Sequence, residues 1–200
     1  MIKKMWPLFL ALSFSCAVAE SAGAITAAEL IEQARAESRE LEELKTVMQS
    51  PDRNLRLSAF ELMMKSDNAV YRELAVEAGL SSTDNLLRSL ALKAAAFNME
   101  SLYIDLSVDE NAPEKAQEKA REALADNVPR MVVKFRTKDR ENDAMEIRIK
   151  NSSGSAEVQG TNFVFNTGYY AGTLSLKDGA VLQGPVSIND NRYLGTAKLR

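Results

Sequence analysis

The chain has 200 residues, of which 46% are hydrophobic and 26% charged, and its formal net charge is −3. A length of this order holds one or two domains. It contains no histidine, and its one cysteine and one tryptophan, Cys16 and Trp6, both lie in the first sixteen residues. Beyond that segment the sequence excludes a histidine base, a cysteine nucleophile, disulfides and zinc ligation through His or Cys.

Residues 1–19 have the pattern of a secretory signal. Two lysines precede an apolar run at residues 8–18, which ends in a small-residue A-x-A cleavage pattern. We therefore expect cleavage after Ala19 and a periplasmic or secreted protein. The run is shorter than the about 20 apolar residues of a membrane-spanning helix, and we expect no transmembrane segment once the signal is removed. Lipidation of Cys16 stays open as an alternative.

The composition changes near residue 129. Residues 20–128 carry 21 acidic and 12 basic residues and are rich in helix-forming Ala, Leu and Glu. Residues 129–200 carry 7 acidic and 11 basic residues and are rich in strand-forming and turn-forming residues. We predict a helical-repeat domain over 20–128 and a β-rich domain over 129–200. The charge asymmetry suits either solvated surfaces or the steering of a charged partner.

A sixteen-residue repeat organises the helical half. Ser50, Ser66 and Ser82 are each followed, after four residues, by apolar-Arg-x-x-Ala-apolar. We expect each serine to cap a short helix, and the helices to stack because none buries its apolar stripe alone. Over residues 50–97 the pattern resembles the HEAT-like helical repeat family, which implies an antiparallel helical array. We interpret the arginine of each copy as a helix-stabilising partner of a nearby Asp rather than as a ligand-binding ladder.

Two further helices flank the repeat in this prediction. The first begins at a capping box, Thr26 to Glu29. The last opens at Asn111-Ala112-Pro113-Glu114 and reaches about Asp126. Between them the repeat decays after Asn98, where only Leu102 and Tyr103 keep their places. The repeat is therefore too short for a long superhelical groove.

The C-terminal half alternates apolar and polar residues, as strands do. Residues 131–137 and 145–150 read as an antiparallel hairpin, and a 23-residue repeat relates Tyr170 and Gly172 to Tyr193 and Gly195. The repeated Tyr-x-Gly resembles the MORN hairpin repeat. The overall prediction is an α+β chain whose helical array is followed by a small antiparallel β-sandwich or open barrel of about seven strands.

Aromatic and asparagine residues of this half are the candidate ligand-binding residues. Such side chains suit a glycan or a peptide when they are exposed, whereas the same alternation is also typical of core and turn residues. The predicted set is Phe163, Asn166, Tyr169, Tyr170, Asn189 and Tyr193.

The remaining chemistry is mostly excluded. The sequence lacks G-x-S-x-G, Walker and G-x-G-x-x-G motifs and a calcium-loop spacing, so we expect no catalytic residue, no metal and no cofactor. A hydrolase built on carboxylates stays as a minor alternative. The acidic balance argues against nucleic acid. We predict an exported, non-catalytic interaction or scaffold protein of the cell envelope with a protein partner. The alternative is a carbohydrate-binding or envelope-polymer-binding module acting through the β domain.

Overall fold

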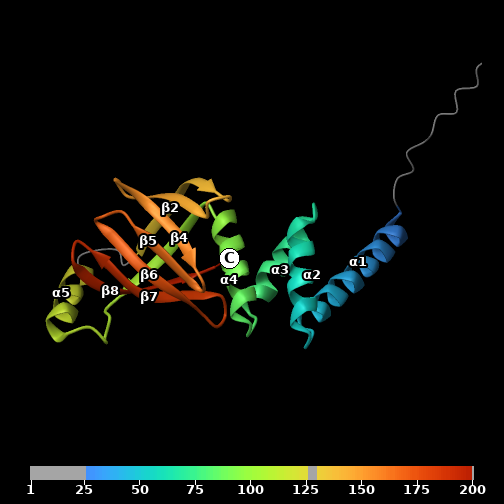
Figure 1. Cartoon of the computed structure of the whole chain (residues 1–200), viewed down its shortest axis with the longest axis horizontal. Coiled ribbons are helices and arrows are strands. Elements are labelled where there is room, and N and C mark those ends of the chain that lie inside the picture. The colour runs from blue at the N-terminus through green and yellow to red at the C-terminus, as the bar shows by residue number, and fades with distance from the viewer. Residues whose placement is uncertain (1–25, 126–129, 200) are drawn as a thin grey trace, which may run out of the picture. The chain divides into compact units, whose positions relative to one another are not determined.

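The computed structural model describes residues 26–125 and 130–199. The signal predicted over residues 1–19 lies outside the described residues. The described residues form five helices and eight strands (Figure 1). The helices are α1 (Ala27–Met48), α2 (Arg53–Lys65), α3 (Ala69–Leu80), α4 (Asn85–Asn98) and α5 (Glu114–Ala125). The strands are β1 (Ser101–Ser107), β2 (Arg130–Asp139), β3 (Ala144–Ile149), β4 (Ser152–Gln159), β5 (Asn162–Asn166), β6 (Tyr170–Lys177), β7 (Val181–Ile188) and β8 (Asn191–Lys198).

The chain divides within α1 into two units, which meet at residues 38 and 39. In the first unit the predicted capping box is confirmed. The backbone N–H of Thr26 donates to Glu29 Oε2 at 2.8 Å, and the N–H of Glu29 donates to Thr26 Oγ1 at 3.3 Å. These hydrogen bonds lower the pKa of Glu29 and keep a negative charge at the helix N-terminus, where it is favoured.

In the second unit, α2, α3 and α4 begin with the same capping arrangement at intervals of sixteen residues. The cap side chain accepts the backbone N–H two residues further on at 2.9 Å, and the serine two residues before the cap accepts the cap's own N–H at 3.1–3.2 Å. The expectation that the serines themselves cap the helices was therefore wrong by two positions. The cap residues are Asp52, Asn68 and Asp84, and the serines are Ser50, Ser66 and Ser82.

The arginine of each repeat copy has a structural role. Arg56 and Arg72 each donate through Nη1 to the backbone carbonyl six residues earlier, at 2.7 and 2.5 Å. Arg88 instead donates through Nη2 to the carbonyls of Leu176 and Lys177 at the end of β6. The first two arginines therefore fix the loops between helices, and the third joins the helices to the strands.

The three helices approach one another closely at a single glycine. A Cβ atom on Gly79 of α3 would lie 2.6 Å from Cβ of Ala91 on α4 and 3.2 Å from the ring of Phe60 on α2. Only a residue without a side chain allows this approach. In Figure 1, α4 lies between the strands and α3, and α2 stands beyond α3. The helices form an array only loosely, and the HEAT-like resemblance remains a prediction.

The strands form a closed antiparallel barrel in the order β1 to β8. The predicted fold class, with a sandwich or open barrel after the helices, is therefore wrong. Closure depends on β1, which pairs with β2 and also with β8, where Asp105 lies opposite Thr196. The stretch 101–107 lies within the predicted helical-repeat domain of residues 20–128, but it forms a strand. In the barrel, Leu102 and Ile104 point inward as alternate residues of a strand do.

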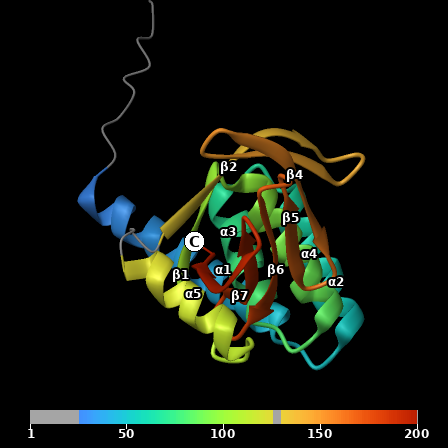
Figure 2. The ribbon, with the colours of Figure 1, turned by 90° about the vertical axis from the view of Figure 1, so that its left-hand side faces the viewer.

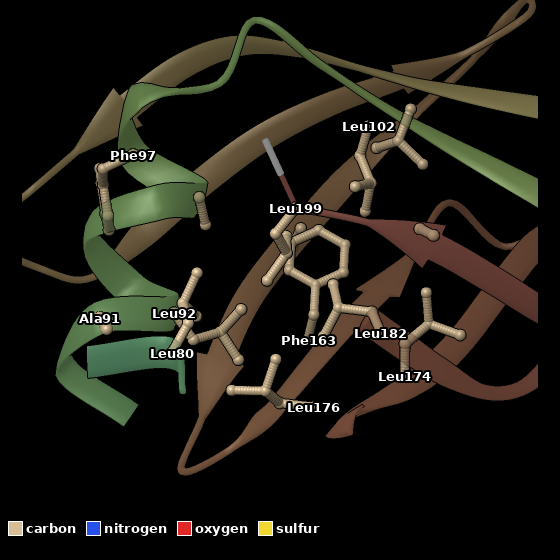
Figure 3. Packing of buried hydrophobic residues seen from close by; sticks show 14 of the residues in the cluster. Leu80, Ala91, Leu92, Phe97, Leu102, Phe163, Leu174, Leu176, Leu182 and Leu199 are labelled. Carbon is tan, nitrogen blue, oxygen red and sulfur yellow. The ribbon is translucent and has the colours of Figure 1, made fainter. Parts of the chain in front are cut away.

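Side chains fill the barrel interior. Alternation with a period of two directs apolar residues from every strand inward, and the largest of them are almost fully buried. Figure 3 shows Leu80 and Leu92 of the helices facing Phe163 and Leu176, so that α4 covers one end of the barrel. The fully buried interior side chains include Leu102, Ile104, Val133, Met145, Ile147, Ile149, Phe163, Phe165, Leu174 and Leu182.

The opposite end of the barrel carries α5, which joins β1 to β2 and packs against β8 (Figure 2). An ion pair fixes its approach, because Arg192 Nε donates to Asp109 Oδ2 at 2.7 Å. The Asp109 side chain is only 4% exposed and also accepts the N–H of Asn111. The last predicted helix is confirmed at its first residue, Glu114.

Candidate functional site

The six candidate ligand residues do not form one surface. Phe163 is a core residue of the barrel, and its ring centroid lies 6.0 Å from that of Phe135 and 6.1 Å from that of Phe165. The edge-on contact with Phe135 is a preferred aromatic geometry. No ligand reaches this ring unless the barrel opens.

The other five lie at the barrel end that carries α5. The rings of Tyr169 and Tyr170 lie 4.9 Å apart, and the carbonyl of Tyr169 accepts the N–H of Asn189 at 3.0 Å. Tyr193 is 5% exposed, and burial raises the pKa of its phenol, with a smaller contribution from Tyr169. Of the three tyrosines, Tyr169 alone offers a substantial face to solvent, with 47% of its surface exposed.

The two candidate asparagines shape turns. Asn166 Oδ1 accepts the N–H of Gly168 at 2.7 Å, which closes the connection between β5 and β6. Asn189 has φ of 46°, a left-handed conformation that asparagine tolerates better than most residues. Both residues are exposed, so their turn roles leave the side-chain surface open to solvent.

A second surface lies on the helices. Leu55 and Leu62 are seven residues apart on α2, and Leu86 and Leu90 are four apart on α4, so each pair shares one helix face. All four are exposed, and Leu62 is the most exposed at 70%. We call these four residues the exposed leucines. The sequence pattern placed Leu55 among the core positions of the repeat, so its exposure was not foreseen.

Ion pairs hold the starts of α2 and α4 together beside these leucines. Arg53 Nε lies 2.6 Å from Asp84 Oδ2, and Arg56 Nη2 lies 3.4 Å from the same oxygen. The hydrogen bond from Arg53 is the main cause that lowers the pKa of Asp84 to about 2, with backbone N–H groups adding to it.

A hollow of about 670 Å³ lies where α3 and α4 meet the turn between β6 and β7. Val76, Leu80, Ala180 and Leu199 contribute apolar surface to it, and charged residues of α3 stand at its rim. Its walls are open to solvent. The hollow is part of the joint between helices and barrel.

A basic surface lies on the outside of β2 and β3, and it was not predicted because its Lys and Arg residues form no continuous run in the sequence. The signal is present in a different form, because alternate residues of a strand share one face. The basic residues around this shallow hollow of about 360 Å³ are Arg130, Lys134, Arg136, Arg148 and Lys150.

Within residues 26–125 and 130–199, no group of three or more His, Cys, Asp or Glu side chains is placed to hold a metal ion. In the same residues no helix combines the length and apolarity needed to cross a membrane. A scan against protein-family models gave no match to the chain, and a search of curated proteins gave no relative. The functional argument therefore rests on the surfaces described above.

Proposed function

We propose that this chain is an exported, non-catalytic interaction protein that serves as a scaffold in the cell envelope. The observation that carries the proposal is the set of exposed leucines, Leu55, Leu62, Leu86 and Leu90. Apolar surface of this kind costs free energy in water and is typical of protein–protein contact sites. The side-chain-filled barrel supports the same view, because it acts as a rigid body that presents surfaces rather than as a container for a ligand.

The experiment is site-specific cross-linking in intact cells. A photoreactive amino acid is placed at Leu62 and, as a matched control, at Lys115 on α5, which is also exposed. We expect one discrete heavier band from position 62 and none from position 115. Recovery of the chain alone from both positions, together with turnover of a substrate by the purified protein, would contradict the proposal.

A second candidate function, binding of a carbohydrate or envelope polymer, is favoured by one observation. Tyr169 exposes its ring at the same barrel end as Asn166 and Asn189, which is the combination that sugar rings and hydroxyls require. The test is retention on peptidoglycan and common polysaccharides at low salt. Tyr169→Ala is expected to abolish retention, whereas Tyr103→Ala, at an equally exposed tyrosine elsewhere on the barrel, is expected to keep it. Absence of retention for the unsubstituted chain excludes this function.

A further inference from the structure

The outer surface of β2 and β3 concentrates positive charge that the fold does not neutralise. We call Arg130, Lys134, Arg136, Arg148 and Lys150 the basic face. Arg130 donates to Asp105 Oδ1 at 2.6 Å. The other four form no ion pair with a residue that the structure describes, and Arg148 Nε donates only to the carbonyl of Lys150. Four of the five charges therefore remain available to an outside anion.

The strand register brings two of these charges into direct opposition. Lys134 lies across from Arg148 in the antiparallel pairing of β2 with β3. Like charges placed opposite each other in a sheet lower its stability. The pair therefore does not stabilise the barrel, and both charges are exposed to solvent, where an anion can reach them.

Other cations of the barrel show what a structural role looks like. Lys138 donates to the carbonyls of Phe97 and Met99 at the end of α4, Arg140 donates to Asn98, and Arg192 pairs with Asp109. Each of these joins a helix or its flanking loop to the strands. The basic face makes no contact of this kind, apart from the bond between Arg130 and Asp105.

We propose that the basic face binds the phosphate groups of an anionic phospholipid bilayer and holds the protein against a membrane surface. Clusters of four to eight Lys and Arg residues are attracted to such surfaces. Arginine pairs with two phosphate oxygens at once and lysine adds a compact charge, so the mixture suits closely spaced phosphates. The binding is peripheral and electrostatic, and it goes beyond the protein contacts proposed for the helices.

The surroundings of the basic face favour a bilayer over a nucleic acid. Tyr103 on β1 lies opposite Val132 of β2 and is 57% exposed, and tyrosine is enriched where membranes meet water. Proteins that bind single-stranded nucleic acid stack successive bases on several aromatic rings. Tyr103 is the only exposed aromatic side chain that the structure describes on β1, β2 or β3, so a stacking platform is lacking there.

The test is sedimentation of the full chain with vesicles of phosphatidylcholine alone or mixed with phosphatidylglycerol. We expect binding only to the mixed vesicles, weakening with added salt as the screening length falls from about 30 Å at 0.01 M to about 8 Å at 0.15 M. The double substitution Lys134→Gln with Arg148→Gln should weaken binding about 25-fold, because each charge near the surface contributes about fivefold. Any contribution of residues 1–19 is common to all variants.

The matched control removes the same charge elsewhere. Lys115→Gln with Lys177→Gln changes exposed lysines of α5 and β6 and should leave vesicle binding unchanged. The basic-face variant should unfold at the same temperature as the unsubstituted chain or higher, because it relieves a like-charge pair. If the basic-face variant binds vesicles more weakly but is no less stable, the loss of binding comes from the removed charges and not from unfolding.

Several outcomes would overturn the proposal. Equal binding to both kinds of vesicle, or an equal loss in the control variant, would remove the basic face as the cause. Release by inorganic phosphate, but not by sodium chloride of equal ionic strength, would identify isolated phosphate rather than a bilayer as the ligand. Tighter binding to a single-stranded oligonucleotide than to anionic vesicles would replace the bilayer with a nucleic acid.

Discussion

The barrel and the helices α2 to α4 both bury apolar side chains, but only the barrel does so around its whole circumference. Every strand of the closed barrel has a neighbour on both sides, so alternation buries one side chain in two around the whole circle. A helix in an array is covered only where another element lies against it. A closed sheet therefore completes its own core, whereas an array leaves exposed whatever faces its open side.

One repeat position shows this gradient directly. Leu87 on α4 is fully buried, Tyr71 on α3 is half-buried, and Leu55 on α2 is 46% exposed, although the three are equivalent in the sixteen-residue repeat. At this repeat position burial falls with the distance of the helix from the barrel (Figure 1). The exposure of Leu55 therefore follows from its position in the array, whereas Leu86 and Leu90 are exposed although α4 lies next to the barrel.

The largest effect is expected in the barrel. Phe163→Ala removes a fully buried ring that contacts Phe135 and Phe165, and such truncations cost about 3–5 kcal/mol. Denaturant unfolding of both chains measures the change in the free energy of unfolding. A loss below about 1 kcal/mol would mean that the barrel core relaxes around the cavity and is not the well-packed body described here.

A smaller loss of stability is expected at the contact between the helices and the barrel. Arg88→Met removes the charged donor of the part-buried carbonyl of Leu176 and the exposed carbonyl of Lys177, and a hydrogen bond from a charged group contributes about 1.5–3 kcal/mol. Arg72→Met is the matched control, because its donor bond stays within the helices at Ser66. Thermal unfolding compares the two variants. If Arg72→Met destabilises the protein as much as Arg88→Met, the joint has no special role.

Local signals made much of the fold predictable. The hairpin of β2 with β3 and the starts of α1 and α5 follow from alternation and capping residues within a few positions of each other. Closure of the barrel was missed because β1 pairs with β8, about ninety residues away, and no local pattern specifies that pairing.

The candidate surfaces were less predictable than the fold. Tyr170 and Tyr193 occupy equivalent repeat positions and both point into the barrel, whereas Tyr169, one residue earlier, is exposed. Residue type suggested a ligand surface, but alternation decides which side chain reaches it. The basic face depends in addition on the register that sets Lys134 opposite Arg148, and register is fixed by the whole sheet.

The pH dependence of stability should show whether the ion pairs of Asp84 with Arg53 and Arg56 add to its role as the cap of α4. The pKa of Asp84 is about 2 in the folded chain against an ordinary value of 3.8. Because the folded value is the lower one, the ionised carboxylate stabilises the protein above pH 3.8, and this contribution is lost as the pH falls toward 2. Asp84→Asn keeps a cap, as Asn68 does for α3, but cannot titrate. Its unfolding temperature should therefore vary less with pH between these values.

The control for that experiment is Asp52→Asn. Asp52 is the equivalent cap of α2, but in the part of the chain that the structure describes it forms no ion pair with Arg53, unlike Asp84. We expect its unfolding temperature to fall with acid in parallel with that of the unsubstituted chain. Equal pH profiles for Asp52→Asn and Asp84→Asn would show that the ion pairs with Arg53 and Arg56 add nothing to capping.

The smallest effect on stability is expected at the exposed leucines, and its smallness is the informative result. Leu62 is 70% exposed, so Leu62→Gln should change the free energy of unfolding by no more than about 0.5 kcal/mol. The matched change at a covered position, Leu87→Gln, buries a polar amide and should be severely destabilising. Denaturant unfolding measures both variants. If Leu62→Gln destabilised the isolated chain by more than about 1 kcal/mol, Leu62 would belong to the core of the array rather than to a surface free for a partner.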